Sequence, residues 1–134
     1  MYVTYGGSNR TQMIRIPAPG RIENRIVDGA ANPYLACAAL LAAGLDGIEN
    51  KIDPCPRNDD NLYEVSEAEL RRRGIGFLPT TLSEAIDCLE QDEVVRGALG
   101  ATYADYYARV KREEWRQYHL AVSPWETDRY LGLY

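Results

Sequence analysis

The sequence predicts an α+β fold, in which a few short antiparallel strands from the edge of a curved sheet are followed by packed helices. Three observations lead to this prediction. Two stretches rich in β-branched residues lie near the N-terminus, on either side of a proline–glycine turn. An alanine-rich apolar run follows an Asn-Pro pair, and helix-start signals recur in the second half of the chain.

The first strands are expected at residues 12–16 and 21–27. The segment Pro17-Ala18-Pro19-Gly20 joins them as a turn, because prolines lack backbone donors and glycine tolerates unusual dihedral angles. The simplest arrangement of the two strands is an antiparallel hairpin. Their β-branched residues are Ile14, Ile16, Ile22, Ile26 and Val27.

A helix is expected to begin at Asn32-Pro33, because asparagine caps helices and proline fits their first position. The residues that follow, 34–45, are almost all apolar. A helix that is apolar on all sides is normally buried. We therefore expect much of the structure that covers this helix to lie outside the 134-residue sequence.

The rest of the chain is predicted to be a loop at 53–62 followed by helices. Residues 66–69 and 81–84 have the pattern of capping boxes, and Gly74 would end the first of these helices. A longer helix is expected at about 102–118. Its predicted packing stripe consists of Tyr103, Tyr106, Tyr107 and Val110.

Composition indicates a soluble globular protein with room for one domain, since 46% of the 134 residues are hydrophobic and 26% are charged. The net charge of -5 argues against nucleic-acid and anionic-membrane partners. Cys37, Cys55 and Cys88 form no CxxC pattern, so we expect neither a disulfide framework nor a zinc site. No apolar run reaches the ~20 residues of a membrane span. A cytoplasmic location is the expectation.

The most informative segment is Arg21-Ile22-Glu23-Asn24-Arg25. Strand side chains alternate, so Arg21, Glu23 and Arg25 are expected on one face, and Ile22 and Ile26 in the core. One interpretation is a solvated, ion-paired strand face. The other is an anion site beside a metal, because guanidinium groups bind phosphates or carboxylates and a glutamate can ligate Mg²⁺.

Arg10 and Arg15 bring two more guanidinium groups close to this segment. Their spacing of five would place them on opposite faces of a regular strand. Convergence therefore requires a bulge, or a position for Arg10 before the strand begins. The sequence alone leaves these alternatives open.

The ordered motifs around these arginines resemble the end of the active site in glutamine synthetases. The motif-dense part covers residues 9–63, and the remaining chain is similar in helical layout only. The resemblance implies that residues 1–134 are the C-terminal portion of a glutamine synthetase-type catalytic domain. The matching blocks are Asn9-Arg10-Thr11, Ile14 to Pro17, Arg21 to Arg25, Ala30 to Leu35, Ala42 to Ile48 and Asn61-Leu62-Tyr63.

The resemblance also implies roles for single residues. Glu23 matches a metal-ligating glutamate that faces the nucleotide phosphates. Arg25 and Arg10 match catalytic arginines near the substrate glutamate and the transferred phosphoryl group. Arg15 and Arg21 match arginines that contact ATP phosphates. The implied activity is ATP-dependent amide formation through γ-glutamyl phosphate, with Mg²⁺ or Mn²⁺, glutamate, and ammonia or methylamine as the acceptor amine.

Departures from the family pattern concern the nucleotide and the amine. The link between Pro17 and Arg21 is shorter than in many members, which often carry a lysine there. Asn24 and residues 27–29 are closer to a divergent branch that includes γ-glutamylmethylamide synthetases. The acceptor is therefore either ammonia or methylamine.

Other functions remain as alternatives. The chain lacks most of the family's metal-binding carboxylates, so we expect that it makes no glutamine by itself and is either a fragment or the partner of a second chain. A non-catalytic module that docks onto an intact synthetase oligomer is the second hypothesis. Homo-oligomers are implied by resemblance. Tyr63 matches a position that some bacterial members adenylylate, but a packed loop residue is favoured, and His119 is expected to be a surface or packing residue.

Overall fold

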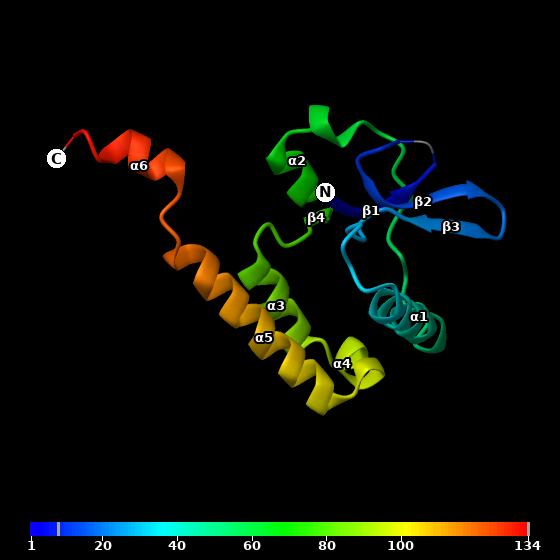
Figure 1. Ribbon diagram of the computed structural model, residues 1–134. Helices are drawn as coiled ribbons and strands as arrows, with labels where there is room; N and C mark the ends of the chain where they lie inside the picture. Colours follow the sequence, from blue (N-terminus) through cyan, green and yellow to red (C-terminus); the bar gives the residue numbers. More distant parts are fainter. Residues whose placement is uncertain (8, 134) are drawn as a thin grey trace. The chain divides into compact units, whose positions relative to one another are not determined.

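The computed structural model describes residues 1–7 and 9–133, which form two compact units, Met1–Leu78 and Pro79–Tyr134 (Figure 1). The first unit contains all the strands, and the second is helical. The predicted α+β fold, with short strands followed by helices, is confirmed. None of the described helices is long and apolar enough to cross a membrane.

The sheet of the first unit is mixed and has the strand order β3-β2-β1-β4. β2 (Gln12–Ala18) and β3 (Arg21–Asn24) form the predicted antiparallel hairpin, which turns at Gly20 with a φ of 73°. β1 (Tyr2–Gly6) pairs parallel with β2, while β4 (Gly76–Phe77) pairs antiparallel with β1.

β3 is shorter than the predicted strand 21–27 and ends at Asn24. The Asn24 side-chain oxygen accepts a hydrogen bond from the Ile26 backbone N–H at 3.0 Å. A local side-chain acceptor of this kind competes with the strand ladder and turns the backbone. Ile22 and Ile26 were predicted in the core, but they are 71% and 38% exposed.

α1 (Pro33–Glu49) begins where the sequence predicts, with the Asn32 side chain accepting hydrogen bonds from the backbone N–H groups of Tyr34 and Leu35. None of its residues is buried. Tyr34 is 84% exposed and Leu41 67% exposed. Within the described chain, the cover that such an apolar helix requires is missing, as the sequence led us to expect.

The loop after α1 leads to the short 3-10 helix η1 (Leu62–Glu64) and to α2 (Glu67–Arg72). Leu62 and Leu70 are buried and form the apolar core of this region. The Ser66 hydroxyl accepts from the Glu69 backbone N–H, as predicted. The reciprocal half of the capping box is absent, since the Glu69 carboxylate binds Arg72 and Arg73 instead.

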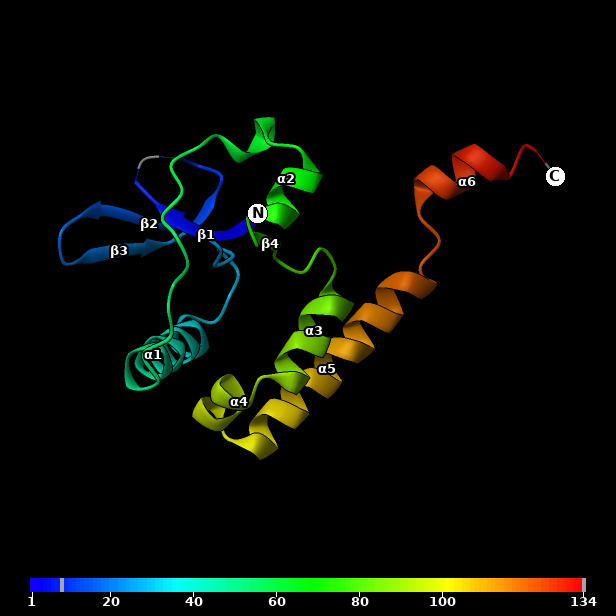
Figure 2. The same cartoon turned by 180° about the vertical axis from the view of Figure 1, so that it is seen from behind.

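The second unit contains α3 (Leu82–Gln91), α4 (Glu93–Leu99), α5 (Ala101–Leu120) and α6 (Pro124–Tyr130). α3 lies beside α5, as Figures 1 and 2 both show. Arg112 on α5 joins the two helices through ion pairs of 2.6 Å to Asp87 and 2.5 Å to Glu90.

The predicted packing stripe of the long helix is wrong for Tyr103, Tyr106 and Val110, which are exposed, whereas Tyr107 is half-buried. Tyr103 and Tyr106 are 42% and 55% exposed, whereas Ala104 and Ala108 are buried. Alanine permits a close approach of the helix backbones, since interaxial distance depends on the side chains at the contact. The two alanines therefore form the packing face of α5.

Candidate active site

The centre of the candidate site is an ion pair between neighbouring strands. Arg15 on β2 lies opposite Glu23 on β3 in the antiparallel register. Directly opposed residues project from the same face of a sheet, and their side chains meet. Nη1 of Arg15 is 3.3 Å from Oε2 of Glu23.

Arg25 follows β3 and approaches the second oxygen of the same carboxylate. Its backbone N–H donates to the Met13 carbonyl at 3.0 Å, which keeps this residue beside β2. Nε of Arg25 lies 3.5 Å from Oε1 of Glu23. Its Nη1 donates to the backbone carbonyl of Asn9 at 2.9 Å. Glu23 is therefore held between two guanidinium groups.

Arg10 completes the group because it lies before β2 begins at Gln12. Of the two alternatives that the sequence left open, the structure adopts the one in which Arg10 precedes the strand. The five-residue spacing therefore does not place Arg10 and Arg15 on opposite faces. Arg10, Arg15, Glu23 and Arg25 line one hollow of about 280 Å³, which we call the arginine hollow. Three guanidinium groups and one carboxylate leave it with an excess of positive charge.

The arginine hollow is suited to an anion with several oxygens. The side chains of Arg15, Glu23 and Arg25 are 38%, 37% and 21% exposed, so a ligand has access to them. Nε of Arg15 is buried and has no hydrogen-bond partner among the described residues. Guanidinium groups bind phosphate and carboxylate oxygens through charge-assisted hydrogen bonds.

Arg21 is not part of the arginine hollow. It lies at the turn, opposite Ala18, and is exposed. In the described part of the chain, no ion pair joins it to Glu23. The prediction that Arg21 and Arg25 lie beside Glu23 is therefore correct for Arg25 and wrong for Arg21. Arg15 lies beside Glu23 in place of Arg21.

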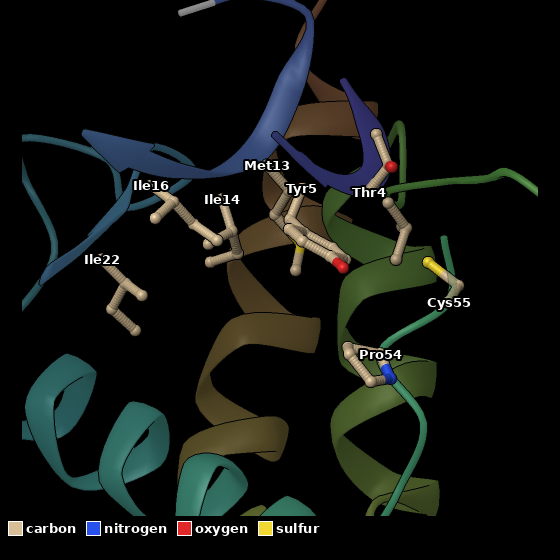
Figure 3. Close-up of a pocket in the computed structure, with 9 residues that line it drawn as sticks. Thr4, Tyr5, Met13, Ile14, Ile16, Ile22, Pro54 and Cys55 are labelled. Atoms are coloured by element: carbon tan, nitrogen blue, oxygen red, sulfur yellow. The ribbon is translucent and has the colours of Figure 1, made fainter. Parts of the chain in front are cut away.

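The opposite side of the strands is apolar. Figure 3 shows Ile14, Ile16 and Ile22 projecting from β2 and β3 to one side, together with Met13 and Tyr5. These side chains line a shallow apolar hollow, so the sheet separates an apolar side from the charged arginine hollow.

Among the residues that the structure describes, Glu23 is the only carboxylate that lines the arginine hollow. Among residues 1–7 and 9–133, no group of three histidine, cysteine or acidic side chains is placed to hold a metal ion. Mg²⁺ is commonly bound through one or two carboxylates together with substrate phosphates and water. Glu23 fits the role of one such ligand, and the described chain offers no complete protein cage.

Two further residues singled out in the sequence lie away from the arginine hollow. Tyr63 is 72% exposed, and its ring lies 6.1 Å from that of Tyr2 in an edge contact. His119 packs against Trp115, with ring centroids 4.0 Å apart. Cys37, Cys55 and Cys88 are free and exposed.

Sequence reasoning assigned no role to the Asn9 side chain or to the loop at 58–60. The structure connects both to the arginine hollow through Arg25. An available signal was the Asn-x-Thr pattern at 9–11, because asparagine often binds the backbone two residues on.

Comparison with known proteins gives matches along almost the whole chain. The family model described as glutamine synthetase, catalytic domain, matches residues 1–130. A glutamate–methylamine ligase from Methyloversatilis universalis is 49% identical over 133 residues, which are 99% of this chain and 30% of that protein. A glutamine synthetase from Methanosarcina mazei is 44% identical over 137 residues, which are 99% of this chain and 31% of that protein.

Two solved structures also match this chain along almost its whole length. A GmaS/ADP complex matches with a TM-score of 0.84 and 49% identity, over 96% of this chain and 29% of that chain. GmaS without ligand matches with a TM-score of 0.83 and the same coverage. The chain thus spans about 30% of the length of the relatives it matches.

Proposed function

Because this chain belongs to the glutamine synthetase family, we propose that it supplies the arginine-rich part of the active site of an ATP-dependent glutamate–amine ligase. The observation that carries the proposal is the arginine hollow, in which Arg10, Arg15 and Arg25 surround the single carboxylate of Glu23. A positive hollow with one carboxylate matches the needs of a triphosphate that arrives with a metal ion.

The residue roles within this proposal follow from the arrangement and the family. Arg15 binds nucleotide phosphates, and Arg21, at the hairpin turn, approaches them only when the nucleotide extends beyond the arginine hollow. Arg10 and Arg25 bind the substrate glutamate and the phosphoryl group that is transferred to it. Glu23 holds Mg²⁺ or Mn²⁺, which supplies charge neutralisation for the phosphates when bound.

The proposed reaction has two steps. A side-chain carboxylate oxygen of glutamate attacks the terminal phosphorus of ATP, which forms γ-glutamyl phosphate and releases ADP. The amine nitrogen then attacks the acyl carbon, phosphate leaves, and the nitrogen loses a proton. Arg10 and Arg25 stabilise negative charge on the transferred group, and their contribution is electrostatic and positional.

The acceptor amine is ammonia or methylamine. Methylamine is favoured by the higher identity with the Methyloversatilis ligase than with the Methanosarcina glutamine synthetase. Assembly into homo-oligomers and a cytoplasmic location complete the proposal.

A chimera tests this function. Residues 1–134 replace the matching segment of the Methyloversatilis ligase, and ADP release is measured with glutamate and either amine. We expect activity that needs glutamate and falls about 10²- to 10³-fold in Arg25→Ala, as for the loss of one donor to a developing anion. Arg116→Ala removes an exposed ion pair on α5 and serves as the control.

Two outcomes would overturn the proposal. One is a folded chimera that is inactive with both amines. The other is an active chimera in which the Arg25→Ala and Arg116→Ala variants have the same activity. We also expect the 134-residue chain alone to release no phosphate from ATP and glutamate, since Glu23 is the only carboxylate in the arginine hollow.

A further inference from the structure

The Asn9 side chain forms a tight turn with Thr11. Oδ1 of Asn9 accepts from the Thr11 backbone N–H at 2.8 Å and from the Thr11 hydroxyl at 2.9 Å. Thr11 is 2% exposed, and its hydroxyl also accepts from the Leu62 backbone N–H at 3.4 Å. The turn is therefore anchored to the buried core of the first unit.

The other end of the Asn9 amide is bound by a distant loop. Nδ2 of Asn9 donates to the backbone carbonyl oxygens of Asp59 and Asp60. These residues are about fifty positions away in the sequence, so the contact joins the start of β2 to the loop after α1. Both polar ends of one amide are thus occupied.

That loop is itself fixed to the sheet. The Asp59 carboxylate accepts from the Gly7 backbone N–H at 2.7 Å, and the Asn58 backbone N–H donates to the Tyr5 carbonyl at 2.9 Å. The Arg57 guanidinium, and then the Gly7 N–H, lower the pKa of Asp59. The loop carbonyls that receive Asn9 are therefore presented by a segment with its own attachments.

The backbone carbonyl of Asn9 is the hydrogen-bond acceptor for Nη1 of Arg25 at 2.9 Å. A guanidinium has five N–H donors in one plane, so a fixed acceptor at one nitrogen restricts the orientation of the whole group. Arg10, the next residue in the chain, also lines the arginine hollow. Asn9, whose side-chain amide is bound at both ends, therefore lies next to Arg10 in the chain and orients Arg25 through its backbone carbonyl.

We propose that Asn9 is a positioning residue, which uses the turn with Thr11 and the clamp to the loop at 59–60 to hold Arg25 in its substrate-binding orientation. This inference rests on the proposed function, because Arg25 is there assigned to glutamate and the transferred phosphoryl group. Asn9 has no contact with substrate in the proposal and acts only through Arg25 and Arg10.

The first test uses the isotopically labelled 134-residue chain and the NMR signals of the Arg25 guanidinium, assigned with Arg25→Lys. In Asn9→Ala we expect Arg25 N–H exchange to accelerate about tenfold, as for the loss of one charge-assisted hydrogen bond. Asn9→Ser keeps a weaker turn acceptor and should restore part of the protection. Asn32→Ala removes a comparable cap, at α1, and should leave Arg25 unchanged.

The second readout is kinetic and uses the chimera described above. Asn9→Ala should raise KM for glutamate several-fold with little change in KM for ATP, whereas Asn32→Ala should change neither. Arg25 protection and a glutamate KM that are equal in wild type and Asn9→Ala would overturn the inference. If Asn9→Ala fails to fold, wild-type Arg25 protection in Asn9→Thr and Asn9→Gly would overturn it as well. An inactive wild-type chimera would count against the function, and the NMR comparison would still decide the role of Asn9.

Discussion

Replacement of Glu23 by glutamine distinguishes a metal ligand from a simple ion-pair partner. The variant Glu23→Gln keeps the shape of the side chain and removes the one carboxylate found among the described lining residues of the arginine hollow. The matched control is Glu67→Gln, which removes a carboxylate paired with Arg71 at 2.6 Å on α2. ADP is the probe, first with a chelator and then with excess Mg²⁺.

The size of the effect follows from distance and exposure. A unit charge about 5 Å from a phosphate gives roughly 3 kcal/mol at an effective dielectric constant of about 20. The Glu23 side chain is 37% exposed, so solvent screens much of this repulsion. We take about 1 kcal/mol as the remaining effect, which is about fivefold in Kd. Metal-free ADP should therefore bind about fivefold more tightly to Glu23→Gln.

Magnesium should reverse this gain. Mg²⁺ reduces the charge of ADP, so three arginines without a carboxylate bind Mg·ADP less well than ADP alone. In the proposed function, Glu23 of the wild-type chain compensates by ligating the metal. We expect the ratio of Kd with Mg²⁺ to Kd without it to be at least about tenfold larger in Glu23→Gln.

The assay is an NMR titration of the 134-residue chain that follows the arginine guanidinium signals up to about 10 mM ADP, which covers millimolar affinity. Equal ratios in wild type and Glu23→Gln would refute the metal role and leave Glu23 as an ion-pair partner. The same change of ratio in Glu67→Gln would show that the effect is not specific to the arginine hollow.

Two further predictions concern stability. Leu62→Ala should lower the free energy of unfolding of the first unit by ~2–5 kcal/mol in urea titrations, because Leu62 is fully buried. Leu41→Ala in α1, where the side chain is 67% exposed, should change this free energy by less than ~0.5 kcal/mol. Equal losses in the two variants would contradict the structure. Arg72, and then Arg73, lower the pKa of Glu69 from 4.5 to about 2. A carboxylate with a depressed pKa stabilises the fold above its unfolded pKa and loses this contribution as pH falls. The protection factors of the α2 amides, which compare their exchange with the intrinsic rate at each pH, should therefore fall between pH 4.5 and 2. A midpoint of the Glu69 titration at 4.5 would contradict the ion pairs.

The local parts of the fold were predictable from the sequence. The hairpin follows from alternating β-branched residues around Gly20, and the start of α1 follows from Asn32-Pro33. β1 was missed, although Tyr2 to Tyr5 are all strand formers. The pairing of β1 with β2 and β4 depends on contacts between separate segments of the chain. Local propensity does not encode such contacts.

Arg15, and not Arg21, lies beside Glu23, and the strand register explains this pairing. Ala18 pairs with Arg21, and a regular ladder from that pair would place Arg15 opposite Asn24. The structure instead pairs Arg15 with Glu23, because the register shifts between Arg15 and Ala18. A one-residue shift changes every pairing beyond it, and no residue type in the turn specifies such an irregularity.

Packing in the helical half was predictable only in outline. The Thr81 cap of α3 occurs as predicted, but Tyr103 and Tyr106 of α5 are exposed while Ala104 and Ala108 pack. Both sets recur at helical spacing, so periodicity alone cannot choose between them. The capping box at Ser123 and Glu126 that starts α6 was also missed, although its spacing is the standard one.

The charge distribution limits the kind of anion that the arginine hollow can bind. The whole chain has a net charge of -5, yet three arginines meet around one carboxylate. A long polyanion would meet the net negative charge of the whole chain, whereas a compact polyphosphate or a dicarboxylate matches the size of the hollow, about 280 Å³. In the proposed role, Glu23 strengthens this selection, because a carboxylate repels a bare anion and attracts one that carries a divalent cation. The same four side chains therefore argue for a metal-bound nucleotide and against nucleic acid.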